Sequence, residues 1–131
     1  MKVECTIVQN DWDGMIPALT AGKFDAIMAG MSVTPKRLQV IDFSNTYAAG
    51  PSGFMVPKSS RLAGLPGTGE ILNMSNGDPR NKDVIDRMHA MLKGKTIGVQ
   101  VATIQANFID KFFKDVATVQ EYKTAEQNDS T

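Results

Sequence analysis

The sequence has few of the residues that mark common enzyme and metal sites. Its 131 residues include one cysteine (Cys5), one histidine (His89) and one tryptophan (Trp12). A single cysteine forms no disulfide within the chain, and a lone histidine lacks the neighbouring ligands of a zinc site. The GxSxG, HExxH, CxxC and GxxxxGK[ST] signatures are also absent. We therefore expect no catalytic residue, no metal and no cofactor.

The sequence also lacks an excess of charge and a long hydrophobic run. It has 14 basic and 14 acidic residues, and the basic ones are scattered, so we expect no nucleic-acid partner. No apolar run approaches the roughly 20 residues that span a bilayer. Residues 1–5 lead directly into a strand-like pattern without a signal-peptide pattern, which leaves the compartment open. A hydrophobic content of 42% supports a packed core, in one domain or two small lobes.

The lone cysteine and histidine each have an ordinary structural interpretation. Cys5 is either a small buried hydrophobic residue at the end of a strand or half of a disulfide whose partner lies outside this sequence. His89 lies off the apolar stripe of its helix, so we expect it on the surface.

The residues that are present alternate between strand and helix patterns. Strands are expected at 3–8, 24–28, 54–56 and 95–100 and within 116–122, and helices at 13–20, 35–40, 79–92 and 104–114. The first two strands are connected by a helix and not by a hairpin turn, which predicts parallel pairing. The pattern predicts an α/β fold with mainly parallel sheets. Its two blocks, 1–49 and 50–131, meet at a small-residue hinge at 48–53, and the second carries an irregular insertion at about 61–80.

One stretch, residues 25–37, predicts a binding site. A short strand is followed by a turn of small residues that includes Gly30 and Ser32. Thr34 is placed to cap the next helix, and Arg37 lies in its first turn. A guanidinium beside free helix-start N–H groups suits a carboxylate ligand. A surface ion pair between Arg37 and Asp42 is the structural alternative.

A second turn, residues 100–105, completes the prediction. It follows a strand in the second block and presents the Thr103 hydroxyl at a helix start. Ligands bind outside the carboxyl ends of strands in open parallel sheets. We therefore expect the two turns to face one small anionic or zwitterionic ligand.

The stretch DWDGMIPALTAGKFDAIMAGMSVTPKRLQVIDFSNTYAAG, residues 11–50, closely resembles the periplasmic solute-binding proteins of polar amino acid and opine ABC transporters. The resemblance implies a periplasmic-binding-protein type II-like fold with two lobes joined by a hinge, truncated at both ends in this sequence. It implies a periplasmic location, an amino acid or opine as ligand, and the membrane permease of an ABC transporter as partner. It also implies that Cys5 pairs with a cysteine upstream.

The resemblance assigns the backbone-binding part of the ligand site residue by residue. Arg37 would bind the ligand α-carboxylate bidentately, assisted by the backbone N–H groups of Ser32 and Ile104. The Ser32 hydroxyl and the Gly30 carbonyl would accept hydrogen bonds from the α-ammonium group.

The resemblance also assigns the residues around the ligand side chain. Trp12 occupies the position of an aromatic residue that stacks on it, and Thr103 and Gln105 line the second-lobe edge. The sequence departs from the family at Ala29 and Gly30, where relatives often have serines, and at Ile104, where many have threonine. These departures leave the preferred ligand side chain open.

Three functions follow as hypotheses. The first is the solute-binding component of an importer, which is not an enzyme. The second is a fragment with impaired ligand binding, in which unpaired sheet edges lead to a swapped homodimer. The third is a dehydratase-like enzyme on the same fold, for which no residue is a strong general acid–base candidate.

Overall fold

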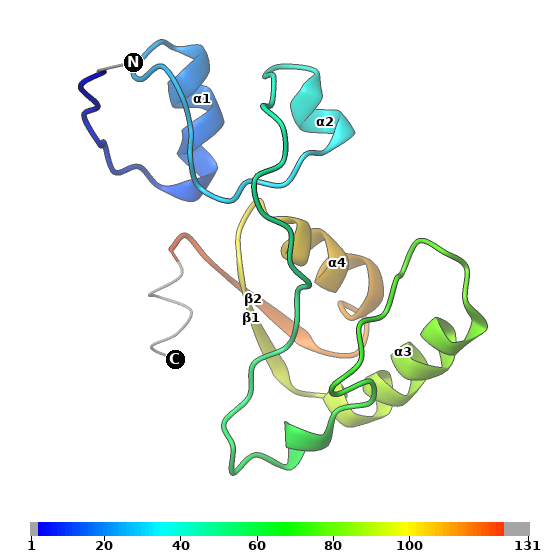
Figure 1. The fold of residues 1–131 in the computed structure, drawn as a ribbon. Coiled ribbons are helices and arrows are strands. Elements are labelled where there is room, and N and C mark those ends of the chain that lie inside the picture. The colour runs from blue at the N-terminus through cyan, green and yellow to red at the C-terminus, as the bar shows by residue number, and fades with distance from the viewer. Residues whose placement is uncertain (1–2, 125–131) are drawn as a thin grey trace.

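The computed structural model describes residues 3–124, which form four α-helices, two short 3-10 helices and two strands. The helices are α1 (Met15–Thr20), α2 (Pro35–Leu38), α3 (Pro79–Leu92) and α4 (Ile104–Phe112), with the 3-10 turns η1 (Trp12–Gly14) and η2 (Arg61–Gly64). The strands are β1 (Thr96–Gln100) and β2 (Thr118–Tyr122). Figure 1 shows α1 and α2 at one end of the molecule and α3, α4 and the strands at the other. None of the helices in the described range is long and apolar enough to cross a bilayer.

The two strands form a parallel pair, as the sequence predicts for this part of the chain. β1 pairs with β2 from Thr96 opposite Thr118 to Gln100 opposite Tyr122. The chain returns from β1 to β2 through α4, which makes one βαβ unit (Figure 1). The carboxyl end of β1 therefore leads directly into the start of α4.

The core lies where α3 and α4 pack with this sheet. Most of the apolar stripe on α3 is buried there, together with Ile97 of β1, Ile109 of α4 and Phe113 just after that helix. The largest of these side chains, Phe113, has no exposed surface and contacts the rings of Phe54 and Phe108 edge-on or tilted. The buried members are Leu65, Val84, Ile85, Met88, Leu92, Ile97, Ile109, Phe113 and Ala117.

Local capping explains where three of the helices begin, and the sequence predicts the first of these caps, at Thr34. The Thr34 hydroxyl accepts a hydrogen bond from the N–H of Arg37 at 3.3 Å, with proline at the first position of α2. Asp78 accepts one from the N–H of Arg80 at 2.9 Å and opens α3. Thr103 accepts one from the N–H of Ala106 at 3.0 Å and opens α4.

Three predicted strands are wrong. Residues 3–8, 24–28 and 54–56 form no strand, and the expected parallel pairing of the first two is absent. A β-branched or apolar run becomes a strand only where another strand pairs with it, and these segments have no such partner in residues 3–124. One large side chain in each segment is accordingly exposed: 95% for Ile7, 85% for Met28 and 83% for Met55.

Several single-residue expectations are also corrected. Ile104, an apolar residue at the first position of α4, is 38% exposed, whereas Phe113 just after that helix fills the core. His89, expected on the surface, is half-buried against the carbonyl of Phe112 and edge-on to the Phe113 ring. Cys5 is exposed with a free thiol, so its interpretation as a buried residue is wrong.

The irregular segment 61–80 also packs more closely than its composition predicts. Leu65 is buried, and Leu62 and Leu72 pack on the core beside it. The segment therefore covers one side of α3.

The core prediction concerns Phe113. Phe113→Ala is expected to lower the free energy of unfolding by about 3 kcal/mol or more, because it empties the best-packed site. Urea unfolding followed by circular dichroism measures the loss. Phe112→Ala is the matched control, because its ring is only half-buried, and an equal loss in both variants would contradict this account of the core.

The capping prediction concerns Asp78. Side-chain and backbone hydrogen bonds from Arg80 hold the pKa of the Asp78 carboxyl below its ordinary value. The stabilisation is therefore present above the pKa of the unfolded chain, about 3.9, and is lost as pH falls through the lower folded value. Asp78→Ala should melt at lower temperature than wild type at neutral pH, and the gap should close in acid.

Asp78→Asn is the control, since its amide oxygen keeps the cap while the charge is lost. Its melting temperature should lie between those of wild type and Asp78→Ala at neutral pH. A gap between wild type and Asp78→Ala that is equal at neutral and acid pH would contradict the role of the charge.

Candidate functional site

Arg37 links the two predicted turns. Its Nη1 donates a hydrogen bond to the carbonyl of Ser32 at 2.7 Å, and its Nη2 donates one to the carbonyl of Ala102 at 3.0 Å. Thr34 and Pro35 fix the start of α2, so that Arg37 lies in its last turn and reaches back to the turn before the helix. The guanidinium thus reaches a carbonyl 65 positions later in the sequence than Arg37 itself.

Trp12 lies at the same point. Its indole Nε1 donates a hydrogen bond to the Ala102 carbonyl at 3.1 Å. The central carbon of the Arg37 guanidinium lies 5.9 Å from the centre of the Trp12 ring, within the range of a cation–π contact. Trp12, Ser32 and Arg37 therefore form one cluster with Ala102, which we call the Ala102 cluster.

The charge of Arg37 has no carboxylate partner within the described part of the chain. The ion pair with Asp42 that the sequence leaves open is not formed. Partial burial lowers the pKa of the Arg37 guanidinium, yet an arginine stays protonated at neutral pH. Of its five N–H donors, two are used by backbone carbonyls. A half-buried, uncompensated guanidinium of this kind suits a carboxylate.

Ala102 holds an unusual backbone conformation in this cluster. Its φ is +58°, and it is the sole non-glycine residue with positive φ in the described range. For an L-residue this region costs about 1 kcal/mol or more, and such strain is concentrated at functional sites. The conformation turns its carbonyl toward both Trp12 and Arg37.

The residues predicted on the first turn of α4 take different positions. Thr103 is buried, and its hydroxyl donates to the carbonyl of Gln100 at 2.7 Å while it caps the helix. Gln105 donates from Nε2 to the hydroxyl of Ser52 at 2.8 Å. Ile104 is partly exposed at the first position of the helix. Thr103 therefore shapes the turn, whereas Gln105 and Ile104 present side chains at its surface.

Gly30 lies outside the contacts of the Ala102 cluster. Its N–H donates to the hydroxyl of Tyr47 at 3.2 Å, and its φ of +61° is one that glycine adopts at no cost. A Cβ added there would meet open space, so conformation and not crowding favours glycine.

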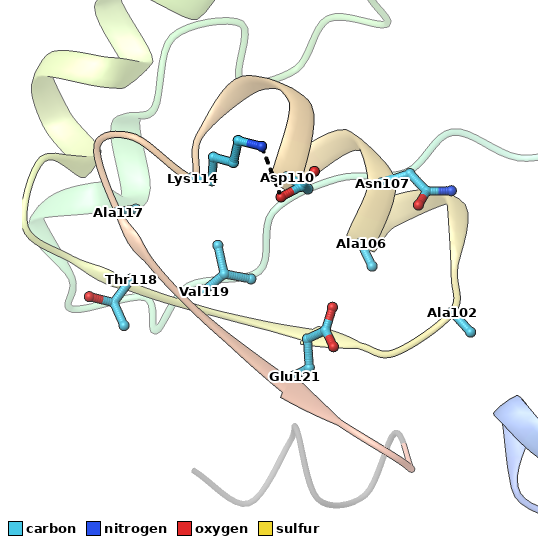
Figure 2. A pocket seen from close by; sticks show the side chains of 9 residues that line it. All are labelled: Ala102, Ala106, Asn107, Asp110, Lys114, Ala117, Thr118, Val119 and Glu121. Carbon is cyan, nitrogen blue, oxygen red and sulfur yellow. Dashed lines mark ion pairs between the residues drawn. The ribbon is translucent and has the colours of Figure 1, made fainter.

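Two hollows lie beside these residues. The larger, about 770 Å³, lies between α4 and β2 and has Ala102 at one end. Figure 2 shows Asp110 and Lys114 paired along its rim, 3.6 Å apart, with Glu121 facing them from β2. The smaller, about 320 Å³, is lined by residues that include Gly30 and Tyr47. The larger hollow has no unpaired cation, so a carboxylate is better matched to Arg37.

A metal site is not formed by the described residues. No group of three histidine, cysteine, aspartate or glutamate side chains lies close enough to hold an ion within 3–124.

Sequence reasoning did not identify three residues that organise this region: Ala102, Ser52 and Tyr47. Alanine carries no signal for a left-handed conformation, which usually belongs to glycine. The contacts of Ser52 and Tyr47 span 53 and 17 residues, and no local pattern predicts them.

Comparisons with known proteins give a family and several relatives for this chain. Residues 1–127 match the family described as "Bacterial extracellular solute-binding proteins, family 3". The chain is 48% identical over 127 residues to the octopine-binding periplasmic protein of Rhizobium meliloti. This match covers 97% of this chain and 43% of that protein. It is 34% identical over 108 residues to the histidine-binding periplasmic protein of Salmonella typhimurium (82% of this chain, 33% of that protein).

A third relative is the ABC transporter arginine-binding protein 1 of Escherichia coli (strain K12), 28% identical over 124 residues, with 93% of this chain and 51% of that protein covered. The chain thus spans about half or less of the length of these curated relatives. All three are named as binding proteins and not as enzymes, which confirms the expectation of a binding protein. The chain belongs to family 3 of the bacterial extracellular solute-binding proteins.

Proposed function

We propose that this chain carries the carboxylate-binding part of the solute-binding component of an ABC importer for polar amino acids or opines. The observation that supports this most directly is Arg37: a half-buried guanidinium, flanked by Trp12, without a carboxylate partner in the described chain. The names of the relatives, which bind octopine, arginine and histidine, support an amino acid or opine as the ligand class.

In the proposed complex Arg37 binds the ligand α-carboxylate through its free N–H groups. The backbone N–H groups of Ser32 and Ile104 add to this contact. Ile104 is the first residue of α4, so its N–H has no partner within the helix. The Ser32 hydroxyl and the Gly30 carbonyl accept hydrogen bonds from the α-ammonium group.

The ligand side chain lies against Trp12, with Thr103 and Gln105 at the opposite edge. The flat indole face suits an aliphatic or guanidinium side chain, because both stack on aromatic rings. The buried Thr103 hydroxyl supports the turn, and the exposed Gln105 amide contacts the ligand directly.

Residues 1–49 and 50–131 are proposed to be parts of two lobes with a hinge at 48–53, and the insertion at 61–80 lies in the second. The contacts of Trp12 and Arg37 with Ala102 support the idea that the two parts approach each other at the site. The hydrogen bond from Gln105 to Ser52 ties the start of α4 to the hinge segment. Ligand contacts from both lobes would stabilise a closed state that the transporter permease recognises in the periplasm.

The test of this site is Arg37→Ala. Isothermal titration of the chain with L-arginine, L-ornithine, L-histidine and octopine should give heat with at least one ligand. Arg37→Ala should weaken that affinity on the order of a hundredfold, because a bidentate charged hydrogen bond is lost. Arg37→Lys should lie between the two, since lysine keeps the charge without the fork.

Arg87→Ala is the matched control, because Arg87 is an exposed arginine paired with Asp83 on α3. Its affinity should equal that of wild type. An unchanged dissociation constant in Arg37→Ala would contradict the assignment, and a folded chain that binds none of the four ligands would contradict the proposed function.

A second candidate is a chain that pairs with another copy instead of binding ligand alone. The chain exposes 10349 Å², whereas a compact monomer of 14.2 kDa exposes about 6,800 Å². The apolar segments around Ile7, Met28 and Met55 account for part of this surface. Sedimentation equilibrium should then give a dimer, and a monomer at all concentrations would exclude this candidate.

A further inference from the structure

Three segments that are distant in the sequence meet at one carbonyl oxygen. The Ala102 carbonyl accepts from Trp12 Nε1 at 3.1 Å and from Arg37 Nη2 at 3.0 Å. Trp12 and Ala102 are 90 positions apart, and Arg37 and Ala102 are 65 apart. A carbonyl oxygen has two lone pairs, so these two donors use its full capacity.

The backbone of Ala102 is what directs this oxygen. Its φ of +58° lies in the left-handed region, although an alanine side chain disfavours it and the six glycines with positive φ lie elsewhere. Strain of this kind persists where the surrounding contacts determine the conformation. Here the two side-chain donors are those contacts, and Thr103 immediately after Ala102 is held by its own hydroxyl in the cap of α4.

A second contact holds the same end of α4. Gln105 Nε2 donates to Ser52 Oγ at 2.8 Å, which ties the first turn of α4 to residues 48–53. The turn is therefore held to the N-terminal part of the chain by Trp12 and Arg37, and to the connecting segment by Ser52. The contact with Ser52 is independent of the two at the Ala102 carbonyl, because it shares neither donor nor acceptor with them.

We propose that Ala102 is a positioning residue: its carbonyl holds the Trp12 indole and the Arg37 guanidinium at the start of α4, in place for a carboxylate ligand. The left-handed conformation is required because it turns the carbonyl toward both donors. Because the two side chains are already held in place before ligand binds, less side-chain entropy is lost on binding. The effect on ligand affinity rests on the proposed function, whereas the contact between Trp12 and Ala102 does not.

The contact has a direct spectroscopic signature. Trp12 is the single tryptophan of the chain, so a ¹H–¹⁵N spectrum contains one indole Nε1–H signal. In the wild-type chain without ligand this proton should exchange slowly and show nuclear Overhauser contacts to Ala102 and Thr103. Absence of both contacts in the folded wild-type chain overturns the proposal, and this measurement depends on no variant.

The variants separate the carbonyl direction from the side chain. Valine disfavours positive φ strongly, so Ala102→Val should turn the carbonyl away and speed indole exchange by about fivefold or more, the value of one lost hydrogen bond. Ala102→Gly adopts the left-handed region freely and should keep the indole proton protected. Equal protection in wild type and a folded Ala102→Val overturns the proposal.

Gly77→Val is the matched control for strain. It places the same side chain at a left-handed residue, φ +69°, with open space around it and far from Trp12 in the sequence. Its indole exchange should equal that of wild type. Fast exchange in Gly77→Val as well as in Ala102→Val would mean that valine at any left-handed turn loosens the chain, and the proposal would then fail.

Affinity provides the second readout. L-arginine or octopine, whichever gives heat with wild type, should bind Ala102→Val about fivefold more weakly. Unchanged affinity together with lost indole protection would overturn the positioning role. Absence of any ligand heat in wild type would count against the proposed function alone, because the indole measurements need no ligand.

Discussion

The arrangement of the site depends on one backbone carbonyl and the two side chains that donate to it. Trp12 and Arg37 come from the N-terminal part of the chain, and Ala102 lies between β1 and α4. Without these hydrogen bonds to the Ala102 carbonyl, the guanidinium would be an exposed charge on a helix of four residues. With them, Arg37 is half-buried, stacked near an aromatic ring and directed by two carbonyls. The proposed carboxylate site thus rests on this constraint and not on Arg37 alone.

The rest of the structure supports that carbonyl. The core between α3, α4 and the parallel strands fixes the end of β1, and the Thr103 cap fixes the start of α4 one residue later. Ala102 is thus held between two rigid elements. By contrast, none of residues 3–8, 24–28 and 54–56 is fully buried, and only Phe54 among them packs against this core. The site therefore draws its rigidity mainly from the C-terminal core.

Much of the helical structure and part of the site were predictable from the sequence. A helix cap depends on residues three positions apart, so the cap at Thr34 was predictable from the sequence. The strands in residues 3–56 were predicted wrongly for the opposite reason. A strand is stabilised by a partner strand, which the local sequence does not specify. β1 and β2 do pair, and the short α4 crossover connects them.

The sequence by itself determined the family, the helix starts and the chemical types present at the site: an arginine, a tryptophan and small residues in turns. These follow from residue identity and short-range spacing. Only the tertiary structure decided that Arg37 bonds to Ala102 and not to Asp42, that Gln105 reaches Ser52, and that an alanine adopts a left-handed conformation. Each of these results from contacts between residues more than 50 positions apart or from the strain that such contacts sustain, and neither has a local signature.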